Sequence, residues 1–107
     1  MQFLILPNNK VPFLEWLESL DIKTQLNIRN RLTRIELANY GDCKVVGKGV
    51  YELRIHYGSG YRVFFGKKGI EVVLIINGGS KGSQKRDITK AQEYWKDYLK
   101  GGAYGSN

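Results

Sequence analysis

The side chains with the greatest potential for chemistry lie on two neighbouring apolar segments. Arg54 and His56 alternate with apolar residues within 50–57, and a period of two predicts a β-strand with one buried and one polar face. Arg62 lies in the next apolar run, after a Gly-Ser-Gly sequence that is typical of a tight hairpin connection. Because cross-strand neighbours approach to about 5 Å between Cβ atoms, Arg54 and Arg62 could flank one anion.

These residue types fit the cleavage of RNA through its own 2′-hydroxyl. That reaction requires a base for the hydroxyl, cations for the charge that develops around phosphorus, and an acid for the leaving 5′-oxygen. Fixed Arg and Lys side chains suit the second task, and histidine ordinarily titrates near neutrality. The chain has one histidine, so His56 would act with a Tyr or Lys, or positioning and charge would dominate. The candidate catalytic residues are Arg54, Arg62, Lys81 and His56.

A second group of side chains is expected to contact RNA around this site. The group consists of Lys48, Tyr57, Tyr61, Gln84, Lys85 and Arg86. The two tyrosines bracket the hairpin turn and could stack on bases. Structural alternatives stay open: the arginines could pair with Glu52 or a helix carboxylate, His56 could be an ordinary surface residue, the tyrosines could pack in the core, and the lysines could be solvated.

Charge favours a polyanionic partner. The 107-residue chain carries 17 Lys and Arg against 10 Asp and Glu, a net charge of +7. The excess is concentrated in residues 42–86, where nine basic residues face three acidic ones. Phosphates attract such a surface and release counterions on binding. Solubility or an acidic protein partner is the alternative reading.

Other classes of site have little support. One cysteine and one histidine leave no disulfide and no zinc site of ordinary spacing, so we expect no metal and no cofactor. The Gly-rich segment 78–83 does not match a phosphate-binding P-loop. Residues 3–6 are too short for the apolar part of a signal peptide, and no segment approaches the roughly 20 apolar residues of a membrane span. We expect a cytoplasmic protein without membrane contact.

The elements that must position these residues follow from periodicity and from breaker residues. We expect a strand at 2–6, helices at 12–20 and 22–39, strands at 50–57, 61–65 and 71–77, a Gly-rich loop at 78–83, and a helix at 87–99. The predicted fold class is α+β, with a three-stranded antiparallel meander and the helices packed on one face of the sheet. Residues 1–100 would form one domain, and 101–107 a flexible tail.

The motifs in this order resemble the addiction-module killer proteins, HigB-like members of the RelE/ParE toxin superfamily. The likeness extends over about residues 11 to 99. It rests on Phe13-Leu14-Glu15-Trp16-Leu17, Gly49-Val50-Tyr51-Glu52-Leu53-Arg54-Ile55, Gly58-Ser59-Gly60-Tyr61-Arg62-Val63-Phe64-Phe65, Leu74-Ile75-Ile76-Asn77-Gly78-Gly79-Ser80-Lys81-Gly82-Ser83-Gln84, and Asp87-Ile88 with Ala91.

The resemblance implies a RelE-like fold and the toxin half of a type II toxin–antitoxin pair. Relatives of this kind mostly cut mRNA, many of them on the ribosome, and the family-like basic positions fall on Arg54, Arg62 and Lys81. The implied partners are mRNA, the ribosome and a small helix-turn-helix antitoxin, with operator DNA contacted only through the antitoxin. The alternative is a ParE-like inhibitor of DNA gyrase, which would use the helical hairpin and the C-terminal region and would have no nuclease activity.

Overall fold

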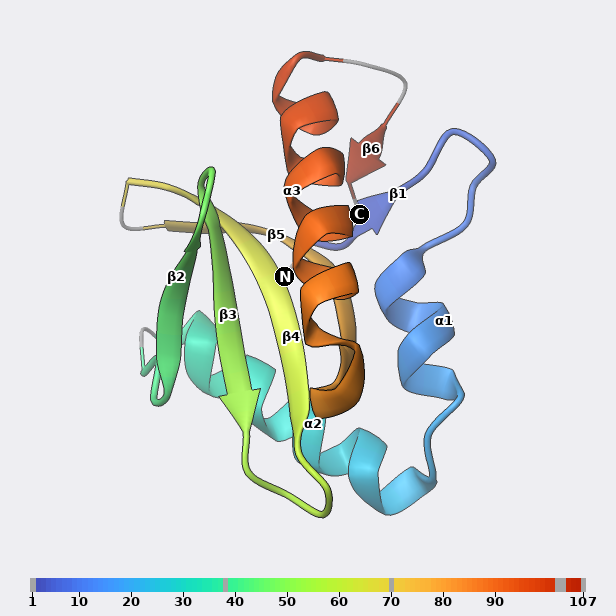
Figure 1. Ribbon diagram of the computed structural model, residues 1–107, viewed down its shortest axis with the longest axis vertical. Coiled ribbons are helices and arrows are strands. Elements are labelled where there is room, and N and C mark those ends of the chain that lie inside the picture. Colours follow the sequence, from blue (N-terminus) through green and yellow to red (C-terminus); the bar gives the residue numbers. More distant parts are fainter. Residues whose placement is uncertain (1, 38, 70, 102–103, 107) are drawn as a thin grey trace.

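The computed structural model describes residues 2–37, 39–69, 71–101 and 104–106. Three α-helices and strands of two antiparallel sheets make up this part of the chain (Figure 1). In chain order they are β1 (Leu4–Ile5), α1 (Pro12–Glu18), α2 (Ile22–Glu36), β2 (Cys43–Gly47), β3 (Val50–Ile55), β4 (Tyr61–Lys68), β5 (Glu71–Ser80), the 3-10 turn η1 (Lys81–Ser83), α3 (Gln84–Leu99) and β6 (Gly105–Ser106).

The two N-terminal helices begin where local chemistry predicts. Pro12 occupies the first turn of α1, where its missing N–H costs no hydrogen bond. Asp21 caps α2 by accepting a hydrogen bond from the backbone N–H of Thr24 at 3.3 Å, which satisfies one of the unpaired donors of the first turn. The predicted helix at 22–39 is too long at its C-terminal end, since α2 ends at Glu36. Ala38 lies outside the described residues.

The main sheet has the order β2-β3-β4-β5, and each neighbouring pair is antiparallel. The predicted meander of three strands is therefore confirmed, but the sequence did not reveal β2. This edge strand is short, and Val45 on it is largely exposed, so it lacks a clear alternation of its own. Pairing with β3, which places Lys44 opposite Glu52, forms the strand.

The third predicted strand is longer than its apolar run. Residues 78–80 were expected in a loop, but they continue β5 and pair with residues 61–63 of β4. A Cβ atom at Gly78 would lie 2.3 Å from the ring of Trp16, so glycine is needed there for α1 to approach the strand. The Gly-rich composition therefore serves helix–sheet packing and not a loop.

The helices cover both faces of the sheet, which corrects the prediction of a single covered face. On β4, Val63 and Phe65 belong to the core formed with α1 and α2. Phe64 points to the opposite face, where it packs with Trp95 of α3, because successive side chains of a strand alternate between faces. Figure 1 shows α3 in front of the sheet and α2 behind it. The architecture is mixed α/β and is compatible with a RelE-like fold.

The C-terminal segment also differs from the prediction of a structureless tail. Residues 105–106 pair with β1 as β6, and Tyr104 packs against the α3 core with its ring centroid 6.1 Å from that of Tyr94. Residues 102–103 and 107 lie outside the described residues. Contacts with a distant strand and helix order this segment, which local sequence reasoning does not detect.

Candidate active site

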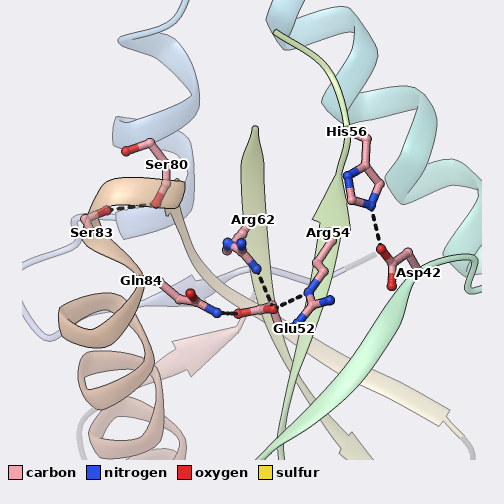
Figure 2. A network of polar contacts seen from close by, with 8 residues as sticks. All are labelled: Asp42, Glu52, Arg54, His56, Arg62, Ser80, Ser83 and Gln84. Atoms are coloured by element: carbon pink, nitrogen blue, oxygen red, sulfur yellow. Dashed lines mark hydrogen bonds and ion pairs between the residues drawn. The ribbon is translucent and has the colours of Figure 1, made fainter. Parts of the chain in front are cut away.

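A buried carboxylate joins the two arginines that the sequence singled out. Arg54 and Arg62 are direct cross-strand partners on β3 and β4. Oε1 of Glu52 accepts hydrogen bonds from Nε of Arg54 at 2.9 Å and from Nη1 of Arg62 at 2.8 Å. The side chain of Glu52 is fully buried, whereas those of Arg54 and Arg62 are 32% and 14% exposed. One anion thus fixes two guanidinium groups that still reach the surface (Figure 2).

Gln84, the first residue of α3, completes this cluster. Its Nε2 donates to Oε2 of Glu52 at 2.8 Å, so the carboxylate accepts at least three hydrogen bonds from three different elements. Burial alone would raise the pKa of Glu52, but the bonds from Arg54 and Gln84 and the charge of Arg62 outweigh burial and hold that pKa below its usual value. In turn, the bond to Glu52 raises the pKa of Arg54. At neutral pH the cluster therefore contains one negative and two positive charges.

The connection between β5 and α3 positions Gln84. A Cβ atom at Gly79 would lie 1.9 Å from Oδ2 of Asp87, so glycine allows the first turn of α3 to lie directly on the end of β5. The hydroxyl of Ser83 donates to the same carboxylate, and Nδ2 of Asn77 donates to the carbonyl of Asp87 at 3.3 Å. These contacts fix the start of α3 and thereby the reach of Gln84 to Glu52.

A pocket of about 290 Å³ opens beside the two arginines. Its lining includes Arg54, His56, Arg62, Lys81 and the turn of residues 58–60. The backbone N–H of Lys81 donates to the carbonyl of Gly60 at 3.4 Å, which ties the end of β5 to the β3–β4 turn. All four candidate catalytic residues therefore line one pocket, and three of them are cations. An anionic group such as a phosphate is the ligand chemistry that this lining fits.

His56 has a partner that the sequence did not suggest. Its Nε2 lies 2.5 Å from Oδ2 of Asp42, which precedes β2. The side chain of His56 is 75% exposed and that of Asp42 is 44% exposed. This contact holds the pKa of Asp42 below its usual value, with the nearby charge of Arg54 acting in the same direction. Because β2 was not predicted, nothing in the sequence placed Asp42 beside His56. A carboxylate on one ring nitrogen orients the imidazole and leaves the other nitrogen for proton transfer.

The structure assigns different surroundings to the predicted RNA-contacting residues. Tyr57 and Tyr61 pack against the core of the α1–α2 face, with the Tyr61 ring 6.3 Å from that of Trp16, although Tyr61 also borders the pocket. Lys85 and Arg86 are exposed on the first turn of α3. Lys48 lies elsewhere, at the opposite end of β3 beside Lys96, Leu99 and Lys100.

The described part of the chain offers neither a metal-binding cluster nor a helix that could span a membrane. No group of three or more His, Cys, Asp or Glu side chains there could hold a metal ion. Among those residues, moreover, no helix combines the length and the apolar character that crossing a membrane requires.

Comparison with known proteins identifies a family. The family model described as "Phage derived protein Gp49-like (DUF891)" matches residues 15–96, a range that contains the Glu52 cluster and Lys81. The chain is 37% identical over 81 residues to an uncharacterized protein of Haemophilus influenzae, and the alignment covers 75% of this chain and 82% of that protein. No solved structure matches significantly. The chain therefore belongs to the Gp49-like family of phage-derived proteins, a toxin-like family of the RelE/HigB type.

Proposed function

We propose that this protein is the HigB-like toxin of a type II toxin–antitoxin system and that it arrests translation by cutting mRNA. The observation that carries the proposal is the pair of arginines fixed by the buried carboxylate of Glu52 at the edge of a cationic pocket. Family membership is consistent with a toxin of this kind.

Fixed cations suit the charge that develops in RNA cleavage. Attack of a 2′-hydroxyl on the adjacent phosphorus adds negative charge to the phosphate oxygens. Arg54 and Arg62 would stabilise that charge without reorganising, because Glu52 already holds their guanidinium groups in place. Removing one preorganised donor from such a site typically lowers kcat about 10²–10³-fold. Lys81, which also lines the pocket, would contribute a third cation.

Proton transfer is assigned to His56 with Asp42. When the carboxylate of Asp42 accepts a hydrogen bond from Nε2, the neutral imidazole has its lone pair on Nδ1. That atom could accept the proton of the 2′-hydroxyl, and Asp42 would stabilise the imidazolium that results. A second histidine is absent from the chain, so the leaving 5′-oxygen would take its proton from Lys81 or from water.

A weak acid–base set favours a substrate that arrives already positioned. Accurate placement of the reacting groups can supply several kcal/mol of the barrier, and a messenger held in the ribosome is placed in this way. The ribosome is itself a polyanion, which the net charge of +7 suits. The proposed partners are thus mRNA, the ribosome and a helix-turn-helix antitoxin that contacts operator DNA, and the proposed location is the cytoplasm.

Mapping of mRNA 5′ ends by primer extension in a translating bacterial extract tests the proposal. We expect new ends on translated messages with the wild-type protein, and a loss of at least 100-fold in their rate of formation with Arg62→Ala or Arg54→Ala. Arg29→Ala is the matched control, because Arg29 is exposed on α2, away from the pocket.

Three outcomes separate the alternatives. Ends that also appear on naked RNA would identify a ribonuclease that does not need the ribosome. Full cleavage by both folded pocket variants would refute the assignment of the site. No new ends, together with inhibition of DNA supercoiling by gyrase, would replace the proposal by a ParE-like function.

A further inference from the structure

We propose that a row of lysines beside α3 holds the backbone of the RNA strand that enters the pocket. We call this surface the basic track; it consists of Lys44, Lys48, Lys85, Lys96 and Lys100. The inference rests on the proposed function for the identity of the strand. It adds a binding site that begins next to the pocket and ends at the far end of α3.

The helix supplies one edge of the track. Positions 85, 89, 92, 96 and 100 follow one another at intervals of three or four residues, so they lie on one side of α3. They are Lys, Thr, Gln, Lys and Lys, without a carboxylate. The exposed acidic residues of this helix, Glu93 and Asp97, fall outside the row. Since α3 begins at Gln84, which contacts Glu52, the row begins at the active site.

The sheet supplies the other edge. Lys44 on β2 is the cross-strand partner of Glu52, and directly opposed residues share a face. Lys44 therefore lies on the face of the sheet that α3 covers, and it is exposed. Glu52 is the acidic residue on this face of β3, but it is buried and neutralised by two arginines. The surface between the two edges is consequently basic.

The β2–β3 turn completes the track, and its backbone is constrained. Gly47, Lys48 and Gly49 all have positive φ, and Lys48 adopts φ 57°, a conformation that costs about 1–2 kcal/mol for a residue with a Cβ atom. The turn is fixed to α3, because Nε2 of Gln92 donates to the carbonyl of Val46 at 2.9 Å. A Cβ atom at Gly49 would lie 2.7 Å from Nε1 of Trp95, so the approach is close.

This constraint places three lysine residues around one hollow at the far end of the track. Lys48, Lys96 and Lys100, with Leu99, line a hollow of about 420 Å³ that has no carboxylate in its lining. Like charges so placed repel one another in the free protein, and an anionic ligand removes that repulsion. The positive φ values of Lys48 and Gly49 are those that a tight two-residue hairpin turn requires, so it is the charges that indicate an anionic ligand.

The dimensions and the surroundings favour an RNA strand over an acidic protein. From position 85 to 100, at about 1.5 Å for each helical residue, the track runs about 22 Å, which corresponds to about six stacked nucleotides. A protein partner would be expected to cover apolar side chains as well. The most exposed large ones are Leu37, Ile22, Val45 and Leu26, on α2, its C-cap and β2, and none of these four lines the hollow. Leu99, which is 49% exposed, does line it.

Binding of 2′-O-methyl oligonucleotides, which cannot be cleaved through the 2′-oxygen, tests the inference. We would measure fluorescence anisotropy for a trinucleotide and an octanucleotide between 0.1 and 1 M NaCl. The test variant combines Lys48→Ala, Lys96→Ala and Lys100→Ala. The control combines Lys10→Ala, Lys23→Ala and Lys90→Ala, which removes the same charge from exposed positions off the track. Thermal unfolding verifies that both variants are folded.

For the octanucleotide, we expect the slope of log K against log salt to become shallower by about 2 in the test variant, since each lost phosphate contact contributes about 0.7. Between 1 M and 0.1 M salt, a slope shallower by 2 means that the affinity of the test variant increases about 100-fold less than that of the wild type. The control should show less than a third of this change, and the trinucleotide should be little affected.

The inference is overturned if the octanucleotide binds to both variants alike, or if the trinucleotide loses as much affinity as the octanucleotide. It is also overturned if the test variant keeps RNA binding but no longer binds the helix-turn-helix antitoxin. These binding measurements do not depend on cleavage. If the wild-type protein binds RNA through the track but does not cut mRNA, the proposed function alone is refuted.

Discussion

Replacing Glu52 by glutamine should destabilise the protein although it removes only one charge. The carbonyl of glutamine could still accept from Arg54 and Arg62, but its NH2 group would face the NH2 group of Gln84 at the place of the 2.8 Å bond. Gln84 would have to turn its amide over to accept a hydrogen bond there, and that bond would then be a neutral one. The remaining hydrogen bonds would also lose the negative partner. Two guanidinium groups would then be held at a partly buried site without an anion.

The size of the effect follows from the bonds around Glu52. A hydrogen bond to a charged group contributes about 1.5–3 kcal/mol and a neutral one about 0.5–1.5 kcal/mol, so three altered bonds sum to about 3 kcal/mol. About a third of the Arg54 side chain is exposed to solvent, and this weakens the contribution of its bond with Glu52 to stability. We therefore expect a loss of about 2–3 kcal/mol at pH 7, equivalent to a Tm lower by about 10–20 °C for a domain of this size.

The dependence on pH gives a second readout. The folded-state pKa of Glu52 is depressed, so its contribution is fully present above the unfolded value of about 4.3 and is lost as the pH falls through the folded pKa. The difference between wild type and Glu52→Gln should therefore be constant near neutrality and shrink in strong acid.

Urea unfolding followed by circular dichroism measures both effects. Glu71→Gln is the matched control, because Glu71 is an exposed strand glutamate, and its substitution should change the free energy of unfolding by less than about 0.5 kcal/mol. A Glu52→Gln variant as stable as wild type at pH 7 would refute the reasoning, since it would mean that the buried carboxylate does not stabilise the arginine pair.

Two further predictions concern packing and the histidine. Gly78→Ala should lower the free energy of unfolding by about 1–3 kcal/mol, because the new methyl group would lie 2.3 Å from Trp16. Gly82→Ala should leave it nearly unchanged, because nothing lies within 4 Å of the new methyl group. Equal midpoints of urea unfolding for both variants would contradict this explanation. His56→Ala should raise the pKa of Asp42 towards its ordinary value of about 3.9, because the contact with His56 is the main cause of the lowered pKa. If NMR shows an unchanged titration of the Asp42 carboxyl group, the two side chains are not in contact in solution.

Local patterns were sufficient for much of the fold and for part of the site. Alternation identified β3, and the Gly-Ser-Gly connection identified β4 as its return strand. Together they placed Arg54 and Arg62 on one face of a hairpin, which the register confirms. Asp21 and Pro12 marked the starts of helices correctly. These features depend on residues close in sequence, where periodicity, capping and turn geometry act directly.

Contacts between distant residues decided the rest. The edge strand β2 forms because β3 offers its hydrogen-bonding groups, and it is β2 that brings Asp42 to His56. Gln84 reaches Glu52 across 32 positions of the sequence, so the role of Glu52 as the anchor of the arginine pair could not be read from spacing. Lys48, predicted from the sequence to contact RNA, lies away from the arginine pair, beside Lys96 and Lys100 at the other end of α3.

The sequence by itself determined which side chains could do chemistry and which of them share a strand face, because the period of a strand is a local property. The tertiary structure alone decided that α3 lies on the polar face of the hairpin, opposite α1 and α2. That choice depends on burying Trp95 against Gly66, where a Cβ atom would lie 2.4 Å from the ring, and such a fit between distant residues leaves no mark on local periodicity. The same packing buries Glu52, and the buried carboxylate then fixes two surface cations as one anion-binding pair.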